Sequence, residues 1–483
     1  MEINPGPLTS EVLTQQHEHR SSNVWENANY TMKPIHNRHH TRHWYTPDPR
    51  VLMYITQAGF YGIYRSGTKF DLDSALITAL VERWRPETHT FHLAVGEATI
   101  TLQDVALLSG SRVDGIAVTG TAAHHWPSEI VRLLGVPAPP NMLKGSSLNM
   151  GWIRNTFHQL PENANDEIVK CHARAYILMM MGGSMFSDAS GTDVQVLYLP
   201  LLEDFEKAGR YSWGSAILAT LYRQLCRASQ REKMDMGGPL ILLQLWAWLR
   251  MPIGRPKFVG FKVRNIDEAT RRRESRRIEK ITLGEGSTLP PFGEQFEIGD
   301  PLLCRWMRCS YKYNGKSKDV AYYRDALDRQ RDDQFTWETY TPDVRGRLPN
   351  ICTSGENIWM AFVPLICFDM VEWHRPDRVM RQFGHQQHIP RPCDNLPLLH
   401  KLDQKGKHDK DWASTHVKYI RLWDRRAESI FAPRVNDFDI SRVAQEYMSW
   451  YKRITQQFLS PQIRPPVGHY QPVAPDLYMM VSV

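Results

Sequence analysis

The chain has 483 residues, of which 42% are hydrophobic and 23% charged, so it is not wholly disordered and is long enough to bury a large core. Its net charge of +7 permits a nucleic-acid partner without requiring one. Seven cysteines are too few for a disulfide framework and favour a reducing compartment. The start lacks a signal-peptide pattern, and the most apolar run, residues 239–249, is too short to span a bilayer. We therefore expect no membrane association.

The first segment of the chain differs in composition from the rest. Residues 1–48 are rich in His, Asn, Thr and Arg and lack apolar periodicity, which predicts a disordered polar tail. Folded structure is expected from there on. Over residues 72–84 apolar side chains recur at helical spacing, with Asp71 or Asp73 as the N-cap and Pro86 as the stop.

A short strand followed by a helix is expected next. β-Branched residues alternate over residues 97–102, which predicts a strand. Thr101 and Asp104 have the spacing of a capping box, and Gly110 is a suitable C-terminal residue for the helix that they open. Three apolar segments further along predict buried helices, at residues 172–188, 215–230 and 238–250.

The composition changes again over residues 254–298, which are first charged and then rich in Gly and Pro. We expect an exposed connection here, joining helical halves at 49–253 and 299–460. The second half includes the apolar run 358–373, which we assign to it as helix. The Pro-rich residues 461–483 predict a second tail. The expected fold is thus mainly α: one large helical domain with a few short strands near residues 90–120, flanked by disordered tails.

Sequence signatures of common catalytic sites are absent. The chain contains no GxGxxG after a strand, no GxxxxGK[ST], no GxSxG, no CxxC and no HExxH. The nearest cysteine pair, Cys304 and Cys309, is spaced too widely to predict a zinc site. We therefore predict no catalytic, cofactor-binding or metal-binding residues, and no cofactor.

Four histidines in the N-terminal segment, His36, His39, His40 and His43, are close enough in sequence to share a metal ion. The segment is polar, and no carboxylate or cysteine is interleaved with the imidazoles. A solvated tail is the favoured interpretation.

A second group of ionisable residues lies in the sequence VEWHRPDRVMRQFG, which contains Glu372, His374, Asp377 and Arg378. A carboxylate that orients a histidine is the usual arrangement for general acid–base catalysis. The alternative is a helix start, with Pro376 in the first turn and an acidic side chain next to the helix N-terminus. We favour the helix start because no nucleophile or metal ligand lies nearby in sequence.

The sequence RRRESRR is a candidate nucleic-acid patch or nuclear-import signal. Glutamates within and beside it dilute the charge, so a solvated helical face is an equally good interpretation. The candidate basic patch consists of Arg271, Arg272, Arg273, Arg276 and Arg277.

Aromatic residues make up 11% of the chain, and many tryptophans fall inside apolar or amphipathic segments. This placement favours core packing over a platform for stacked bases. The tryptophans concerned are Trp213, Trp246, Trp248, Trp359, Trp373, Trp412, Trp423 and Trp450.

The sequence FHLAVGEATITLQDVALLSGSRVDGIAVTG, residues 91–120, resembles the plant mobile domain, the aminotransferase-like domain of the Maintenance-of-Meristems and MAIN-like proteins. Further blocks follow in the order that the family has, and the resemblance covers about residues 50–460. Ala94 departs from the family, which usually has Leu or Pro there. The blocks YSWGSAILATLYRQLCRAS and VEWHRPDRVMRQFGHQQHIP carry our candidate interaction or family-motif residues, which are Trp213, Ser215, Glu372, His374, Asp377 and Arg378.

This resemblance implies a nuclear protein that supports meristem maintenance, genome stability and the silencing of genes and transposons. It also implies protein partners, among them a plant protein-phosphatase-like or MAIN-like protein, and a family that occurs in transposable elements as well as in host genes. The label aminotransferase-like would imply pyridoxal phosphate, which needs a Schiff-base lysine. Lys170 and Lys418 lie on amphipathic segments and are expected to be exposed.

We therefore interpret the chain as a non-enzymatic nuclear scaffold that acts through protein–protein contacts. Two alternatives stay open. The first is a nucleic-acid-binding protein of transposon origin, which would use the basic patch. The second is a cryptic hydrolase or transferase, which would use Glu372, His374 and Asp377.

Overall fold

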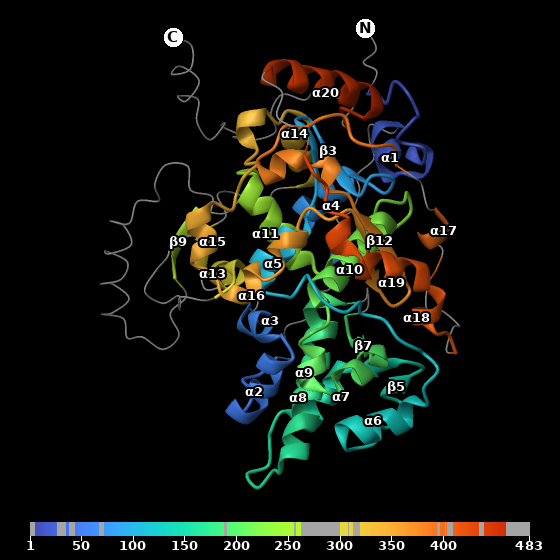
Figure 1. Cartoon of the computed structure of the whole chain (residues 1–483), viewed down its shortest axis with the longest axis vertical. Helices are drawn as coiled ribbons and strands as arrows, with labels where there is room; N and C mark the ends of the chain where they lie inside the picture. The colour runs from blue at the N-terminus through green and yellow to red at the C-terminus, as the bar shows by residue number, and fades with distance from the viewer. Residues whose placement is uncertain are drawn as a thin grey trace.

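The computed structural model of the chain has mainly helical elements and short strands (Figure 1). This agrees with the predicted mainly α fold. The residues that the structure describes are 5–26, 35–37, 44–66, 72–187, 191–255, 257–261, 300–307, 309–312, 319–393, 397–400, 402, 409–433 and 439–459.

Part of the predicted N-terminal tail is folded against the body. A 3₁₀ turn, η1 (Gln16–Glu18), leads into helix α1 (Arg20–Glu26). Arg20 is fully buried, and its guanidinium donates a hydrogen bond to the carbonyl oxygen of Ala228, at 2.9 Å. The prediction of a disordered tail is therefore wrong for residues 5–26. Polar side chains hold this segment through partners far away in sequence, and local apolar periodicity carries no sign of such contacts.

The predicted N-terminal histidine group is only partly described. His36 lies in strand β1 (His36–Asn37), which pairs in parallel with β8 (Asp235–Met236). The other three histidines, His39, His40 and His43, lie outside the described residues.

The first predicted helix forms with the expected cap. In α4 (Ser74–Val81) the Asp73 carboxylate accepts hydrogen bonds from the backbone N–H groups of Ala75 and Leu76. Helices α2 (Pro49–Gln57) and α3 (Tyr61–Ser66) precede it.

Strands near residue 90 form one small antiparallel sheet, as predicted in outline. Its strands are β2 (Trp84–Arg85), β3 (Thr90–Leu93) and β4 (Gly96–Ala98), in that order. The capping box of Thr101 and Asp104 then opens helix α5 (Leu102–Ser109), and Gly110 ends it in the left-handed conformation at φ 64°.

The predicted apolar helices form the centre of the molecule. Helix α10 (Trp213–Ala228) lies in the middle of the fold and packs against α5 (Figure 1). Its neighbours in sequence are α8 (Asp166–Met180), which ends in a π turn, and α11 (Leu240–Arg250). The elements between α5 and α10, apart from α8, are α6 (Trp126–Leu134), β5 (Leu143–Lys144), β6 (Ser147–Asn149), α7 (Met150–Phe157), β7 (Asp193–Gln195), η4 (Val196–Leu202) and α9 (Phe205–Ala208).

The apolar run over residues 358–373 is not a helix. It contains two antiparallel strands, β11 (Val363–Cys367) and β12 (Met370–His374), joined by a tight turn at Phe368 (φ 51°) and Asp369. The prediction failed because β11 is buried on both faces, so its sequence shows no alternation of polar and apolar residues.

Further elements surround this hairpin. They are β9 (Lys257–Phe261), α13 (Leu302–Met307), β10 (Cys309–Lys312), α14 (Val320–Asp328), η5 (Asp332–Gln334), α15 (Pro342–Gly346), α16 (Asn350–Thr353), η6 (Glu356–Ile358), η7 (Pro376–Arg378), η8 (Met380–Phe383), α17 (Pro397–His400), α18 (Trp412–Thr415), α19 (Val417–Asp424), η9 (Arg426–Glu428) and α20 (Ile440–Ile454).

Both predicted halves of the chain share one core. Helix α10 from the first half packs against β11 and β12 from the second, and buried side chains from Ile35 to Trp423 form one continuous cluster. Six of the eight tryptophans that we singled out are buried, and Trp373 and Trp450 are partly buried, which confirms their packing role. Within the described residues, no helix is both long and apolar enough to cross a membrane.

A buried cluster of histidine, cysteine and glutamate as the candidate functional site

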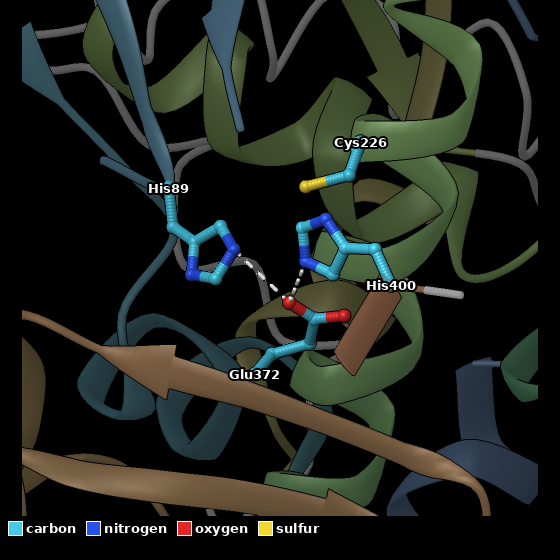
Figure 2. A group of neighbouring side chains, drawn as sticks. All are labelled: His89, Cys226, Glu372 and His400. Carbon is cyan, nitrogen blue, oxygen red and sulfur yellow. Dashed lines mark hydrogen bonds and ion pairs between the residues drawn. The ribbon is translucent and has the colours of Figure 1, made fainter. Parts of the chain in front are cut away.

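Four side chains from distant parts of the chain converge in the core around Glu372. Figure 2 shows His89, Cys226, Glu372 and His400 pointing toward one another from four different elements. One potential ligand atom from each residue lies within 4.8 Å of those from all the others. His89, Cys226 and Glu372 are each less than a tenth exposed, and His400 is half-buried. We call these four residues the Glu372 cluster.

The backbone holds His89 in an unusual conformation. It lies between β2 and β3 with φ 54°, which is uncommon for a non-glycine residue. Its Nδ1 is 2.9 Å from the carbonyl oxygen of Trp373, and its Nε2 is 3.0 Å from Oε2 of Glu372. Because a carbonyl oxygen only accepts hydrogen bonds, Nδ1 must carry the proton.

Cys226 is on α10 and presents its sulfur to the centre of the cluster (Figure 2). The indole N–H of Trp84 donates a hydrogen bond to Sγ, at 3.2 Å. Burial raises the pKa of Cys226 well above its ordinary value, so the group is a thiol when no cation lies beside it.

Glu372 is on β12 and uses its two oxygens for different partners. Oε1 accepts a hydrogen bond from Nε of Arg223, whereas Oε2 faces Nε2 of His400 at 2.9 Å as well as His89. Burial favours the neutral acid, but Arg223 and then His400 lower the pKa of Glu372 well below its ordinary value. The carboxylate is therefore charged.

The chemistry of this donor set is restricted. Imidazole nitrogen, thiolate sulfur and carboxylate oxygen are the ligand types that zinc prefers in proteins. General acid–base catalysis would also need access for a substrate. Three of the four groups are buried, and the fourth is half-buried at the edge of the cluster.

Only one residue of the predicted acid–base group belongs to this cluster. His374 is fully buried, with Nδ1 donating to the carbonyl oxygen of Ala361 at 2.8 Å and Nε2 accepting from the backbone N–H of Leu102 at 3.4 Å. Asp377 accepts from the backbone N–H of Arg391, at 3.2 Å. The side chains of Glu372, His374 and Asp377 thus bond to different partners.

Arg378 takes part in a second buried cluster. It lies in the 3₁₀ turn η7 with Pro376 at the first position, which resembles the predicted helix start on a smaller scale. Its Nε donates to Oε1 of Glu97 at 2.7 Å, and both side chains are almost fully buried. This arginine is an internal counter-ion.

The other predicted family-motif residues are packed inside. Trp213 donates its indole N–H to the carbonyl oxygen of Ala208 at 2.8 Å, and Ser215 donates its hydroxyl to that of Val113 at 2.8 Å. Both are buried at the start of α10, so they fasten this helix to neighbouring loops.

Two further predictions concern exposed charges. The candidate basic patch, Arg271, Arg272, Arg273, Arg276 and Arg277, lies outside the described residues. Lys170 forms ion pairs with Asp166 and Glu167 on the surface of α8, and Lys418 is exposed on α19, as expected.

Sequence reasoning missed three members of the Glu372 cluster, His89, Cys226 and His400. They are spread over some three hundred residues and follow no metal-ligand spacing. The only local signal was Glu372 itself, an acidic residue in an apolar segment. Folding alone brings the four together.

Comparison with known proteins matches residues 59–452 to the family described as Plant mobile domain. A relative from Arabidopsis thaliana named Protein MAINTENANCE OF MERISTEMS is 33% identical over 92% of this chain and 82% of its own length. Protein MAIN-LIKE 1 from the same plant is 33% identical over 94% of this chain and 80% of its own length. No solved structure matches.

A third relative, also from Arabidopsis thaliana, is named Serine/threonine-protein phosphatase 7 long form homolog. It is 44% identical over 100% of this chain, but the match spans only 34% of that relative's length. The chain thus spans about a third of this relative and 62% of another, Protein MAIN-LIKE 2. The family match covers most of the sequence, from α3 to α20, and the chain belongs to the plant mobile domain family.

Proposed function

We propose that this chain is a non-enzymatic scaffold of the nucleus that acts through protein partners in meristem maintenance, genome stability and the silencing of genes and transposons. The observation that carries the proposal is the match to Protein MAINTENANCE OF MERISTEMS, which extends over 92% of this chain and 82% of that relative. A match of this extent supports a shared role for the whole domain.

The internal chemistry of the described residues is consistent with a scaffold. Buried ionisable groups pair with one another across the fold, as Arg378 does with Glu97 and Arg223 with Glu372. Such pairs fix the packing of distant segments. A body with one continuous core presents its surface to partners in a fixed arrangement.

The partner that we propose is a phosphatase-like or MAIN-like protein. The relative named as a phosphatase homolog matches this chain over a third of its own length. In that protein the matching region and the remainder belong to one polypeptide. In the present case the corresponding partner would be a separate chain.

Affinity purification tests the proposal. The full chain with a C-terminal tag is expressed in plant cells, its location is recorded, and nuclear extracts are purified after nuclease treatment. We expect nuclear signal and recovery of a phosphatase-like or MAIN-like protein at levels well above a tagged, nucleus-directed control protein. Cytoplasmic signal, or recovery of background proteins only, would contradict the scaffold.

The alternatives predict different results in the same material. A nucleic-acid-binding protein would lose its partners after nuclease treatment, and its affinity would fall steeply with salt because bound phosphates release counterions. Alanine at the five arginines of the candidate basic patch would then weaken binding. A hydrolase or transferase would turn over a model phosphate ester or acyl ester, and Glu372→Gln would abolish this activity.

A further inference from the structure

We propose that His89, Cys226, Glu372 and His400 bind one zinc ion that fastens four distant segments of the fold together. The four residues share no motif spacing in the sequence, and the site is independent of the scaffold role. It would link the β2–β3 sheet, α10, β12 and α17 (Figure 2).

The first support is the donor set and its proximity. Two imidazoles, a thiol and a carboxylate each place one atom within 4.8 Å of the other three. Four such donors complete a tetrahedral zinc site without a water ligand. The pairs that are in direct contact, Glu372 with His89 at 3.0 Å and with His400 at 2.9 Å, leave a cation only a small outward adjustment to make.

The second support is a conflict between two lone pairs. Since Nδ1 of His89 carries the proton for the Trp373 carbonyl, the neutral ring has a lone pair on Nε2. This buried atom has no hydrogen-bond donor among the described residues and faces a carboxylate oxygen of Glu372, which is also an acceptor. A cation between the two turns a repulsive contact into two ligand bonds.

The surroundings orient the ligands in the way that metal sites require. The Trp373 carbonyl fixes the His89 tautomer with Nε2 available, the Trp84 indole donates to the Cys226 sulfur, and Arg223 holds the Glu372 oxygen that is not used. Partners of this kind hold and tune metal ligands.

The charges also balance. Zinc carries two positive charges, and the Cys226 thiolate and the Glu372 carboxylate together carry two negative charges. Binding releases the thiol proton to solvent, and both histidines bind as neutral rings. With four ligands from the protein, the ion is structural rather than catalytic.

The segment that gains most from the ion is α17. This helix has only four residues, and its His400 is the most exposed member of the cluster. Zinc binding would anchor it to α10 and β12 in the core. Removing His400 therefore removes a ligand while leaving the buried part of the cluster packed.

The test is the zinc content of the purified full chain, produced with zinc in the medium and measured by mass spectrometry of the metal after gel filtration. We expect one zinc per chain, and a loss of at least tenfold in affinity in His400→Ala and Cys226→Ser. Two matched controls, Cys171→Ser and His158→Gln, change residues outside the cluster and are expected to keep the ion. Wild-type protein that holds no zinc, or ligand variants that hold as much as the controls, would overturn the proposal.

A second measurement separates ligand loss from misfolding. Zinc is replaced by Co²⁺, whose visible absorption reports a tetrahedral site with a thiolate ligand. We expect these bands in the wild type and in His400→Cys, in which a sulfur ligand replaces nitrogen. They should be absent in Cys226→Ser even when its circular dichroism is that of the wild type. Cobalt spectra without a thiolate band in the wild type would also refute the site.

Discussion

Two buried glutamates in this protein have similar neighbours and different chemistry. Glu97 on β4 and Glu372 on β12 are each about 1% exposed, and each is paired with an arginine and faces histidine. Around Glu97, Oε1 accepts from Arg378 at 2.7 Å and from the Thr90 hydroxyl at 2.9 Å, and His92 Nε2 lies 3.3 Å away. We call Glu97, Arg378, Thr90 and His92 the Glu97 cluster.

The other ring nitrogen of each histidine makes the difference. Nδ1 of His92 contacts the hydroxyl of Thr455 at 2.8 Å, and a hydroxyl can donate or accept. Nε2 of His92 is therefore free to hold the proton and donate it to Glu97. Nδ1 of His89 contacts a carbonyl, so Nε2 faces Glu372 without a proton. One cluster is complete as a hydrogen-bond network, and the other is complete only with a cation.

The largest effect should come from breaking the Glu97 cluster. Arg378→Met leaves Glu97 buried without its main counter-ion, which is expected to lower the free energy of unfolding by about 3–5 kcal/mol. Urea unfolding followed by tryptophan fluorescence measures this loss. The control is Arg347→Met, whose pair with Asp343 is exposed and is worth about 0–1 kcal/mol. Equal losses in the two variants would show that burial does not strengthen the first pair.

Zinc should stabilise one cluster and leave the other unaffected. At free zinc about a thousandfold above its dissociation constant, the wild type is expected to gain about 4 kcal/mol in the free energy of unfolding. Glu97→Gln should keep this gain, whereas Glu372→Gln should lose most of it. Unfolding in zinc buffers of graded concentration measures the increment. A similar loss in both variants would remove the distinction between the clusters.

Acid should act on the Glu97 cluster through His92. Burial lowers the pKa of His92 from 6.5 to about 4, so between these values the unfolded chain binds a proton that the folded chain does not. Stability therefore falls as the pH falls from 6.5 to 4, by about 3 kcal/mol for this group. His92→Gln should show a correspondingly flatter pH profile, measured with a chelator present so that zinc does not contribute.

Glu97 itself titrates mainly below this range. Burial would raise its pKa, but Arg378 and His92 lower it from 4.5 to about 2. Its contribution is present above pH 4.5 and is lost as the pH falls toward 2. A His92→Gln profile as steep as that of the wild type between pH 6.5 and 4 would contradict the assignment to His92.

The smallest effect concerns a neutral donor of the Glu97 cluster. Thr90→Val removes the hydroxyl that donates to Glu97, and a hydrogen bond to a charged group is worth about 2 kcal/mol. Zinc content should not change. The control is Thr56→Val, which removes an exposed helical hydroxyl bonded to the Leu52 carbonyl and should alter stability by about 0.5 kcal/mol or less. A loss of zinc in Thr90→Val would mean that the two clusters are coupled.

Much of the fold was predictable because the responsible interactions are local. The Asp73 cap, the capping box of Thr101 and Asp104 and the left-handed Gly110 all depend on residues within a few positions of one another. The hairpin of β11 and β12 was not predictable, since a strand buried on both faces has the same composition as a buried helix. The folded N-terminal segment was missed because its contacts are polar and distant.

The amino-acid order alone was enough to establish a mainly helical body, a tryptophan-rich core and the family resemblance, because periodicity, caps and long collinear motifs can be read along the chain. Which charges meet was settled by folding. Glu372 and His374 are two residues apart and bond to different partners, whereas Glu372 and His89 are far apart in sequence and lie in contact. Pairing of buried groups depends on three-dimensional distance and on which ring nitrogen holds the proton, and neither quantity is encoded in local spacing.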